Sequence, residues 1–289
     1  MTKKVDPLAQ QKPKVDVMQE KATPGGEGGG TNGEVPGEIV PLPSKGKLYE
    51  TDHPLYGEDS VQIKRMSNKE ENILHSRALI RKGLVVNELI KSCLLNKSID
   101  PDGLLIGDKS AILTAVRITG LGKDYLTKTT SPCCEEVFDH TFDLSKCQIK
   151  ELAEDPIKTG ENLFEFTLPQ SGAKVKFKLL TAGDESDISA TQEARRKAIK
   201  KQAPNASEVD TNITDRLMKS IVSYDGERDK FKIAKHVMEM RSPDSRAIRS
   251  YIRRIEPDLN MVEEVECPQC GDVEKHNIPM GIEFLWPEL

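Results

Sequence analysis

The chain has 289 residues, enough for one large domain or two modest ones with a buried core. Hydrophobic residues make up 36%, aromatic residues 4% and charged residues 31%, which is poorer in core-forming side chains than an average globular enzyme and predicts that part of the chain is unfolded. The net charge of -5 excludes a global basic field that would recruit nucleic acid or an anionic membrane, so a protein partner is favoured.

No apolar run reaches the roughly 20 residues of a membrane span, and the N-terminus lacks the apolar core of a signal peptide. We therefore expect a cytosolic protein without membrane contact. In that compartment the six cysteines are not expected to form structural disulfides, so their clustering indicates metal binding or burial. Cys93 stands alone and is expected in the core.

Residues 1–38 are predicted to form a disordered N-terminal arm, because they mix Lys, Gln, Pro and Gly with almost no bulky apolar side chain. Residues 39–65 form an extended segment, in which Pro41 and Pro43 hold the backbone open. Its apolar side chains either pack on the chain's own domain or dock on a neighbouring subunit. These side chains belong to Ile39, Val40, Leu42, Leu48 and Tyr49.

Residues 66–122 are predicted to be helical. Ser67 and Glu70 have the spacing of a capping box and begin a first helix. A second helix with a single apolar stripe begins near Leu84. Asp108 is expected to cap a third helix.

Strands are predicted in three further regions. Residues 123–143 and 262–280 each have the pattern strand, turn, strand, with cysteines in the turn. Residues 162–180 form another hairpin, because apolar side chains alternate along both of its halves.

Residues 184–256 are predicted to be mostly helical, with helices over about 209–223 and 228–240 and a last one that begins at Ser242. The last helix has an apolar stripe that faces the core and a separate basic stripe. The basic stripe is either the solvated side of the helix or the place where an acidic partner docks. Its arginines are Arg246, Arg249 and Arg253.

The stretch E-C-P-Q-C-G-D, residues 266–272, has the C-P-x-C-G pattern of a zinc-ribbon turn, whose backbone N–H groups point at thiolate sulfur. An earlier stretch, T-S-P-C-C-E-E, residues 130–136, aligns with it and places Cys134 opposite Cys270. The alignment puts Ser131 where a first cysteine should stand. Three thiols of four therefore remain in register.

The predicted metal ligands are the cysteines of these two turns. The fourth thiolate would come from the neighbouring cysteine of the first turn after a shift in the backbone, and His140, Cys147 and His276 are the other candidates. The alternatives are one structural zinc ion, or a relic whose hairpins pack without metal. The predicted ligand set is Cys134, Cys267, Cys270 and Cys133.

These elements predict an α+β fold with a helical core and antiparallel hairpins, two of which form a discontinuous, degenerate zinc-ribbon-like sheet. Because about 130 residues separate the two cysteine turns, the late hairpin must fold back onto the early one. The helices between them then belong to the same unit, so residues 39–289 are predicted to form a single α+β domain.

No nucleophile elbow, phosphate loop or H-E-x-x-H motif occurs in the sequence, and the five histidines are scattered. A metal held by four protein ligands has no open position for a substrate. We therefore expect no enzyme, no catalytic residue and no cofactor besides the structural zinc.

Six motifs follow one another along the chain in a characteristic order. They are G-E-I-V-P-L-P-S-K-G-K-L-Y from Gly37, M-S-N-K-E-E-N-I-L-H-S-R from Met66, L-L-I-G-D-K-S-A-I-L-T from Leu104, the first cysteine turn, D-S-R-A-I-R-S-Y-I-R-R-I from Asp244, and the second cysteine turn. Together they resemble the baseplate hub and hub-assembly protein family of T-even-type contractile-tailed bacteriophages. The resemblance covers residue 37 to the end. Family members commonly carry both cysteine turns complete, so Ser131 is a departure.

The resemblance implies a virus-encoded, non-enzymatic protein that is made in the infected bacterial cytoplasm and helps to build the central hub of the tail baseplate. It would act as a permanent part of the virion or as an assembly factor, with other baseplate hub proteins as partners and without nucleic acid or membrane.

The other hypothesis is a zinc-ribbon regulator that binds nucleic acid through residues 195–201 and the late arginine helix. The acidic balance of the chain and the lack of aromatic residues between these basic side chains argue against it.

Overall fold

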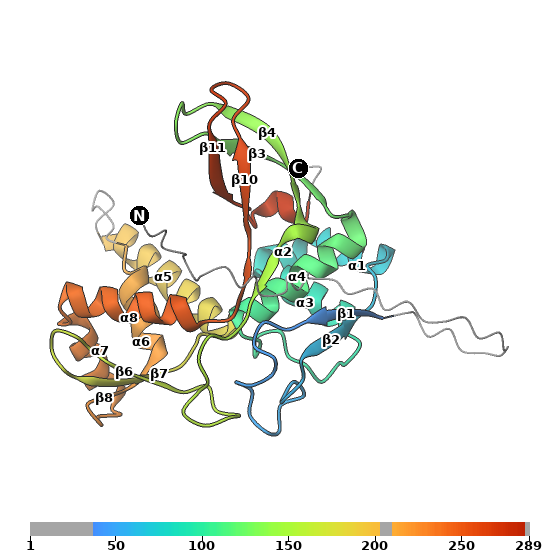
Figure 1. Cartoon of the computed structure of the whole chain (residues 1–289). Coiled ribbons are helices and arrows are strands. Elements are labelled where there is room, and N and C mark those ends of the chain that lie inside the picture. The colour runs from blue at the N-terminus through green and yellow to red at the C-terminus, as the bar shows by residue number, and fades with distance from the viewer. Residues whose placement is uncertain (1–36, 203–209, 287–289) are drawn as a thin grey trace, which may run out of the picture.

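The computed structural model describes residues 37–202 and 210–286. It is an α+β fold, as predicted, in which helices pack with several small antiparallel sheets. Figure 1 shows helices α1–α4 on one side of the molecule, helices α5–α8 on the other, and two hairpins that rise above both. Nearly all of the predicted N-terminal arm, and the loop expected over 203–207, lie outside the described residues.

The extended segment begins as a strand. β1 (Glu38–Pro41) pairs antiparallel with β2 (Ser60–Ile63), and Val40 lies opposite Val61. The segment between the strands continues into the core, where Leu42 is 1% exposed and Leu48 and Tyr49 are also buried.

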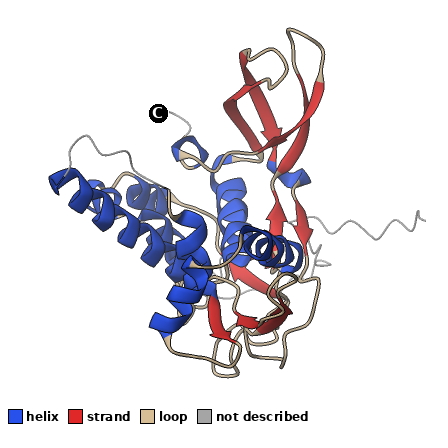
Figure 2. Cartoon of the chain, turned by 90° about the vertical axis from the view of Figure 1, so that its left-hand side faces the viewer, coloured by secondary structure: helices blue, strands red, loops and turns tan. Residues whose placement is uncertain are grey.

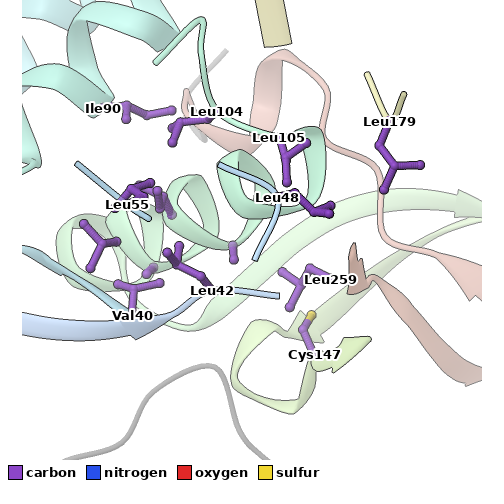
Figure 3. Packing of buried hydrophobic residues seen from close by; sticks show 14 of the residues in the cluster. Val40, Leu42, Leu48, Leu55, Ile90, Leu104, Leu105, Cys147, Leu179 and Leu259 are labelled. Atoms are coloured by element: carbon purple, nitrogen blue, oxygen red, sulfur yellow. The ribbon is translucent and has the colours of Figure 1, made fainter. Parts of the chain in front are cut away.

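Of the two alternatives for this segment, the structure supports packing on the chain's own core. Figure 3 shows Val40, Leu42 and Leu48 in one cluster with Leu105 and Leu259. Ile39 is half-buried beside them. The side chains of Val40, Leu42, Leu48 and Tyr49 are therefore not free to dock on a neighbouring subunit, because their apolar surface is already covered by this chain.

Asp108 holds the extended segment against α4 (Ile106–Leu121). It accepts hydrogen bonds from the backbone N–H of Ser44 at 2.9 Å, from the Ser44 hydroxyl at 2.6 Å and from the Tyr49 hydroxyl at 2.6 Å. The expectation that Asp108 caps α4 is wrong, because the N-cap is Leu105 and the carboxylate is used by the segment that crosses the helix.

The first predicted helix is divided in two. α1 (Asn68–Leu74) and α2 (Arg77–Lys82) are separated at His75, and α2 ends where Gly83 adopts a φ of 69°. Gly83 suits this left-handed conformation because it has no Cβ. α3 (Val85–Cys93) follows, with its apolar stripe turned into the core as predicted.

Glu70 is buried at the start of α1 and forms the predicted capping box with Ser67. Its burial would raise the pKa of the carboxyl, but hydrogen bonds from Lys64, Ser67 and Ser92 outweigh burial and lower the pKa to about 2 from an ordinary value of 4.5. Ionised Glu70 therefore stabilises the folded state above about pH 4.5, and this contribution is lost as the pH falls towards 2.

We expect the difference in unfolding free energy between wild type and Glu70→Gln to be about 3 kcal/mol at pH 7 and to shrink below pH 4.5. Urea unfolding at pH 7, 4.5 and 3 measures this difference. A difference that stays constant over this range would show that the charge of Glu70 does not contribute to stability.

The hairpin predicted over 162–180 is confirmed. β6 (Phe164–Thr167) pairs with β7 (Lys174–Phe177), and Phe164 stacks on Phe177. Asp244 accepts hydrogen bonds from two backbone N–H groups of the turn, at 2.7 and 3.1 Å, and so fastens the hairpin to α8 (Ser242–Ile255).

A third strand of this sheet was not predicted. β8 (Ile221–Tyr224) pairs with β7, so the helix expected over 209–223 ends at Ser220. The remaining helices of this side are α5 (Ala182–Gln202), α6 (Asn212–Ser220) and α7 (Lys230–Met238). Within the described residues, no helix has both the length and the apolar composition of a membrane span.

The late part of the chain returns to the early part at two places. β5 (Gln148–Lys150) pairs antiparallel with β9 (Asp258–Asn260), a contact that the sequence did not indicate. α4 passes close to the same place, because a Cβ at Gly107 would lie 2.1 Å from the carbonyl oxygen of Pro257.

Beyond this contact lie the two hairpins predicted to pair. β3 (Asp124–Thr130) pairs with β4 (Val137–Asp143), and β10 (Val262–Glu266) pairs with β11 (Val273–Asn277). Figures 1 and 2 show the hairpins side by side above the rest of the molecule.

The base of the first hairpin is anchored by the buried side chain of Arg117. Its guanidinium donates to the carbonyl oxygens of Gly122 and Asp124 and lies over the rings of Tyr125 and Phe284, 5.1 and 5.6 Å from their centroids. Phe284 belongs to the short 3-10 helix Ile282–Phe284, so the C-terminal end of the described chain also supports the hairpin.

Candidate metal centre and contact surface

The turns at the tips of the two hairpins have the same backbone geometry. In the first, Ser131 N–H donates to the Glu136 carbonyl at 2.8 Å; in the second, Cys267 N–H donates to the Asp272 carbonyl at 2.8 Å. Each turn has a second backbone hydrogen bond of 2.9 Å. Glu135 N–H donates to the Ser131 carbonyl, and Gly271 N–H donates to the Cys267 carbonyl.

The donors of these second hydrogen bonds, Glu135 and Gly271, both have positive φ, at 57° and 70°. Most side chains avoid this region, and glycine enters it without strain. Because Glu135 keeps the conformation without being glycine, the first turn retains the shape of the second although its sequence has diverged. The alignment of Ser131 with Cys267 and of Cys134 with Cys270 is thus confirmed in three dimensions.

Three thiols meet between these turns. The sulfur atoms of Cys134, Cys267 and Cys270 lie within 4.8 Å of one another, and those of Cys134 and Cys267 are 3.7 Å apart. A tetrahedral zinc with Zn–S bonds of about 2.3 Å separates its sulfur ligands by about 3.8 Å. The donor set therefore fits a zinc ion, which prefers thiolate ligands in this arrangement.

The other candidate ligands do not join this cluster. The sulfur of Cys133 is not among those that lie within 4.8 Å of one another, and the Cys147 sulfur is buried 3.8 Å from the sulfur of Met261. His276 is bonded through Nδ1 to the Thr129 hydroxyl at 3.0 Å, and the ring of His140 packs against Phe142. Among the described residues, the group that could hold a metal is formed by the three cysteines alone.

At Cys267 the second turn also favours the thiolate form that a metal needs. Backbone N–H groups of Cys270 and Gln269 donate to the Cys267 sulfur and lower the pKa of this thiol. The three cysteines could therefore hold a metal ion, which would join two hairpins that are distant in the sequence.

The arginine stripe of the last predicted helix lies on α8. Arg246 and Arg253 are exposed and Arg249 is half-buried, while Ile248 and Ile255 on the opposite side of the helix are buried. The periodicity of the sequence had indicated this division of the helix into two faces.

Two of these arginines line a pocket of 410 Å³ between α8, α6 and the start of α4. Arg249 and Arg253 enter it from α8, and Arg216 enters from α6. Arg216 is paired with Glu185, and the Nε of Arg249 donates to the carbonyl oxygen of its own helix at Ser245. The buried residues that line the pocket include three leucines, Leu105, Leu179 and Leu217, and the polar Ser220. Glu256 also lines the pocket.

Arg216 was missed in the sequence because nothing in its neighbourhood distinguishes it from a solvated helix residue. It joins the stripe only because α6 and α8 pack together, a relation that periodicity within one helix does not reveal. Arg246, in contrast, lies on the same helix as Arg249 but does not line the pocket.

The basic run over 195–201 lies at the end of α5 and is partly engaged within the chain. Arg195 donates to the Thr211 hydroxyl and pairs with Asp215 at 3.3 Å, and Lys197 pairs with Glu193 at 2.7 Å. These contacts give the nucleic-acid hypothesis no support.

A comparison with known protein families identified a match. A family model described as T4 bacteriophage base plate protein matches residues 39–286, which include the buried extended segment, both cysteine turns and the arginine helix. Searches of curated proteins and of solved structures gave no match. Because the family model spans most of the chain, this protein belongs to the T4 bacteriophage base plate protein family.

Proposed function

We propose that this protein is a non-enzymatic component or assembly factor of the baseplate hub, which acts through protein contacts while the phage tail is built. The observation that carries the proposal is the family match over residues 39–286. The narrower assignment to the hub rests on the motifs that resemble hub and hub-assembly proteins.

The non-enzymatic character is supported by how the distinctive polar side chains are used. His53 stacks on Tyr49 at 4.4 Å between ring centroids and its Nδ1 accepts a hydrogen bond from the backbone of Leu55. The buried carboxylates Asp108 and Asp244 accept hydrogen bonds that hold loops in place. Each of these groups has a structural role.

The proposed contact for a partner protein is the pocket between α6 and α8. Two guanidinium groups beside buried leucines suit a partner segment that presents a carboxylate next to an apolar side chain. Such a contact would also agree with the partners that a baseplate protein needs, which are other structural proteins of the virion.

We expect the double variant Arg249→Glu/Arg253→Glu to reduce the infectious titre of the phage, because each reversal replaces an attraction by a repulsion and costs about 2 kcal/mol or more of binding free energy. The matched control is Arg77→Glu/Arg81→Glu, which makes the same charge change on exposed residues of α2. Titre and the content of this chain in purified virions, by quantitative mass spectrometry, are the measurements.

Normal titre from a folded Arg249→Glu/Arg253→Glu protein would contradict the proposed contact. The same mass spectrometry on wild-type phage separates the two roles within the proposal. A few copies in the virion identify a permanent hub subunit, whereas presence in the infected-cell lysate alone identifies an assembly factor.

We also propose that Cys134, Cys267 and Cys270 hold one structural zinc ion. The support is the fit of their sulfur positions to a tetrahedral site and the matching geometry of the two turns. When bound, zinc would cross-link the two hairpins. The residues of the chain supply the site itself, through turns that direct backbone N–H groups at the sulfur atoms.

A further inference from the structure

Ser131 occupies the position at which the second turn carries the ligand Cys267. The two residues have the same backbone hydrogen bonds. The N–H of each donates to the carbonyl of the residue five positions later, and the carbonyl of each accepts from the N–H of the residue four positions later. Because the backbone geometry of the two turns is the same, the Cα–Cβ bonds of Ser131 and Cys267 have the same direction relative to their turns. The Ser131 side chain therefore points into the cluster, as the Cys267 side chain does.

The surroundings of Ser131 agree with this placement. Its side chain lies at the tip of an otherwise exposed turn, with Pro132 and Cys133 both exposed, yet Ser131 itself is 2% exposed. Its hydroxyl oxygen lies 4.0 Å from the Cys270 sulfur, close to the 3.7 Å that separates Cys134 from Cys267. The three thiols and this hydroxyl therefore form the four corners of one site.

We infer that Ser131 is the fourth ligand of the metal site, so that this chain binds its metal through three sulfur atoms and one oxygen atom. The inference rests on the proposed zinc site and specifies its composition. Cys133 does not take this role in the observed turn, because its sulfur is not among the three that lie within 4.8 Å of one another, whereas the buried Ser131 hydroxyl lies 4.0 Å from the Cys270 sulfur.

A serine ligand has a predictable chemical consequence. The hydroxyl of serine is neutral, so the site with a divalent ion has a net charge of about -1 instead of the -2 of four thiolates. Oxygen is also a harder ligand than sulfur and suits zinc less well than thiolate does. The site should therefore bind zinc, and it should bind it more weakly than the same turns with a complete set of cysteines.

The test uses the full-length chain in a Cys133→Ala background, which removes the rival thiol of the first turn. Ser131→Ala and Ser131→Cys are compared with the background protein. Zinc affinity is measured by competition with a chromophoric chelator, and the ligand atoms are identified by X-ray absorption at the zinc edge and by the visible spectrum of the cobalt-substituted protein.

We expect three sulfur ligands and one oxygen ligand in the background protein and four sulfur ligands in Ser131→Cys, with affinity higher by about tenfold or more. Ser131→Ala should bind about tenfold more weakly than the background protein, a smaller effect than the loss of about 100-fold expected for a thiolate, because a neutral hydroxyl is a weaker ligand. Its cobalt spectrum should also change when 2-mercaptoethanol is added, because the vacated position accepts an external thiol, whereas the spectrum with Ser131 present should not change.

The outcomes separate this inference from the proposals on which it depends. If Ser131→Ala binds zinc as tightly as the background protein, Ser131 is not a ligand, although the zinc site with three cysteines stands. If neither protein binds zinc, both the ligand assignment and the zinc proposal fail. The baseplate function is tested independently by virion composition and titre.

Discussion

Replacing Cys267 with alanine is expected to abolish retention of zinc by the purified full-length protein. Cys267 is the buried member of the cluster, its sulfur lies 3.7 Å from that of Cys134, and its thiolate form is favoured by backbone N–H groups. Structural zinc sites contribute about 10–16 kcal/mol in all, which is roughly 3 kcal/mol for each of four ligands and corresponds to a loss of about 100-fold or more in affinity.

The measurement is zinc per chain after dialysis against metal-free buffer, with Cys133→Ala as the matched control. Cys133 belongs to the same turn as Cys134 but lies outside the cluster, so its replacement should leave zinc retention unchanged. Equal loss of zinc from both variants would contradict the assignment of ligands. Retention by Cys267→Ala would contradict the site itself.

Asp108→Ala is expected to reduce the unfolding free energy by about 4 kcal/mol. The side chain of Asp108 is fully buried and accepts hydrogen bonds from Ser44 N–H, the Ser44 hydroxyl and the Tyr49 hydroxyl. Without the carboxylate these donors remain buried, and each unsatisfied group costs about 1–3 kcal/mol. The extended segment would also lose its polar attachment to α4.

Urea unfolding at neutral pH measures the effect, and Asp155→Ala is the control. Asp155 also pairs with a residue of the extended segment, Lys47 at 2.8 Å, but its side chain is 76% exposed, so its loss should change stability by only about 0.5 kcal/mol. Similar losses for both variants would mean that Asp108 contributes no more than a surface ion pair.

Local patterns in the sequence were sufficient for much of the fold. Alternation of apolar residues located the β6–β7 hairpin, and the spacing of Ser67 and Glu70 located the start of α1. The two cysteine turns indicated that distant hairpins meet, because a shared metal requires its ligands to converge. The first two features depend on residues that are close together in the sequence. The third depends on a chemical requirement that brings distant residues together.

The remaining features depend on contacts that local patterns do not encode. The role of Asp108 follows from Ser44, which is 64 positions away, and a capping interpretation was equally consistent with the sequence. β8 forms because β7 offers it a free edge, although Ile221–Tyr224 also continues the pattern of the helix before it. The sequence indicates that Ser131 replaces a cysteine ligand, but it does not indicate that the Ser131 side chain is buried.

The return of the late hairpin to the early one has a consequence for the order in which the protein is completed. Cys134 and Cys267 are 133 positions apart, and a ribosome that adds about 5–20 residues per second needs roughly 7–27 s to make the chain between them. During this delay the first hairpin and β5 exist without the strands and cysteines that later cover them.

An unpaired strand edge can form backbone hydrogen bonds with another chain, so the nascent protein is most prone to aggregation in this interval. The final tenth of the sequence closes the cysteine cluster, and the strand just before it pairs with β5. A chain that stops before β9 would therefore contain helices α1–α8 but would leave the edge of β5 unpaired and the first hairpin without the second hairpin beside it. Such a chain would be open to pairing with other chains through β5.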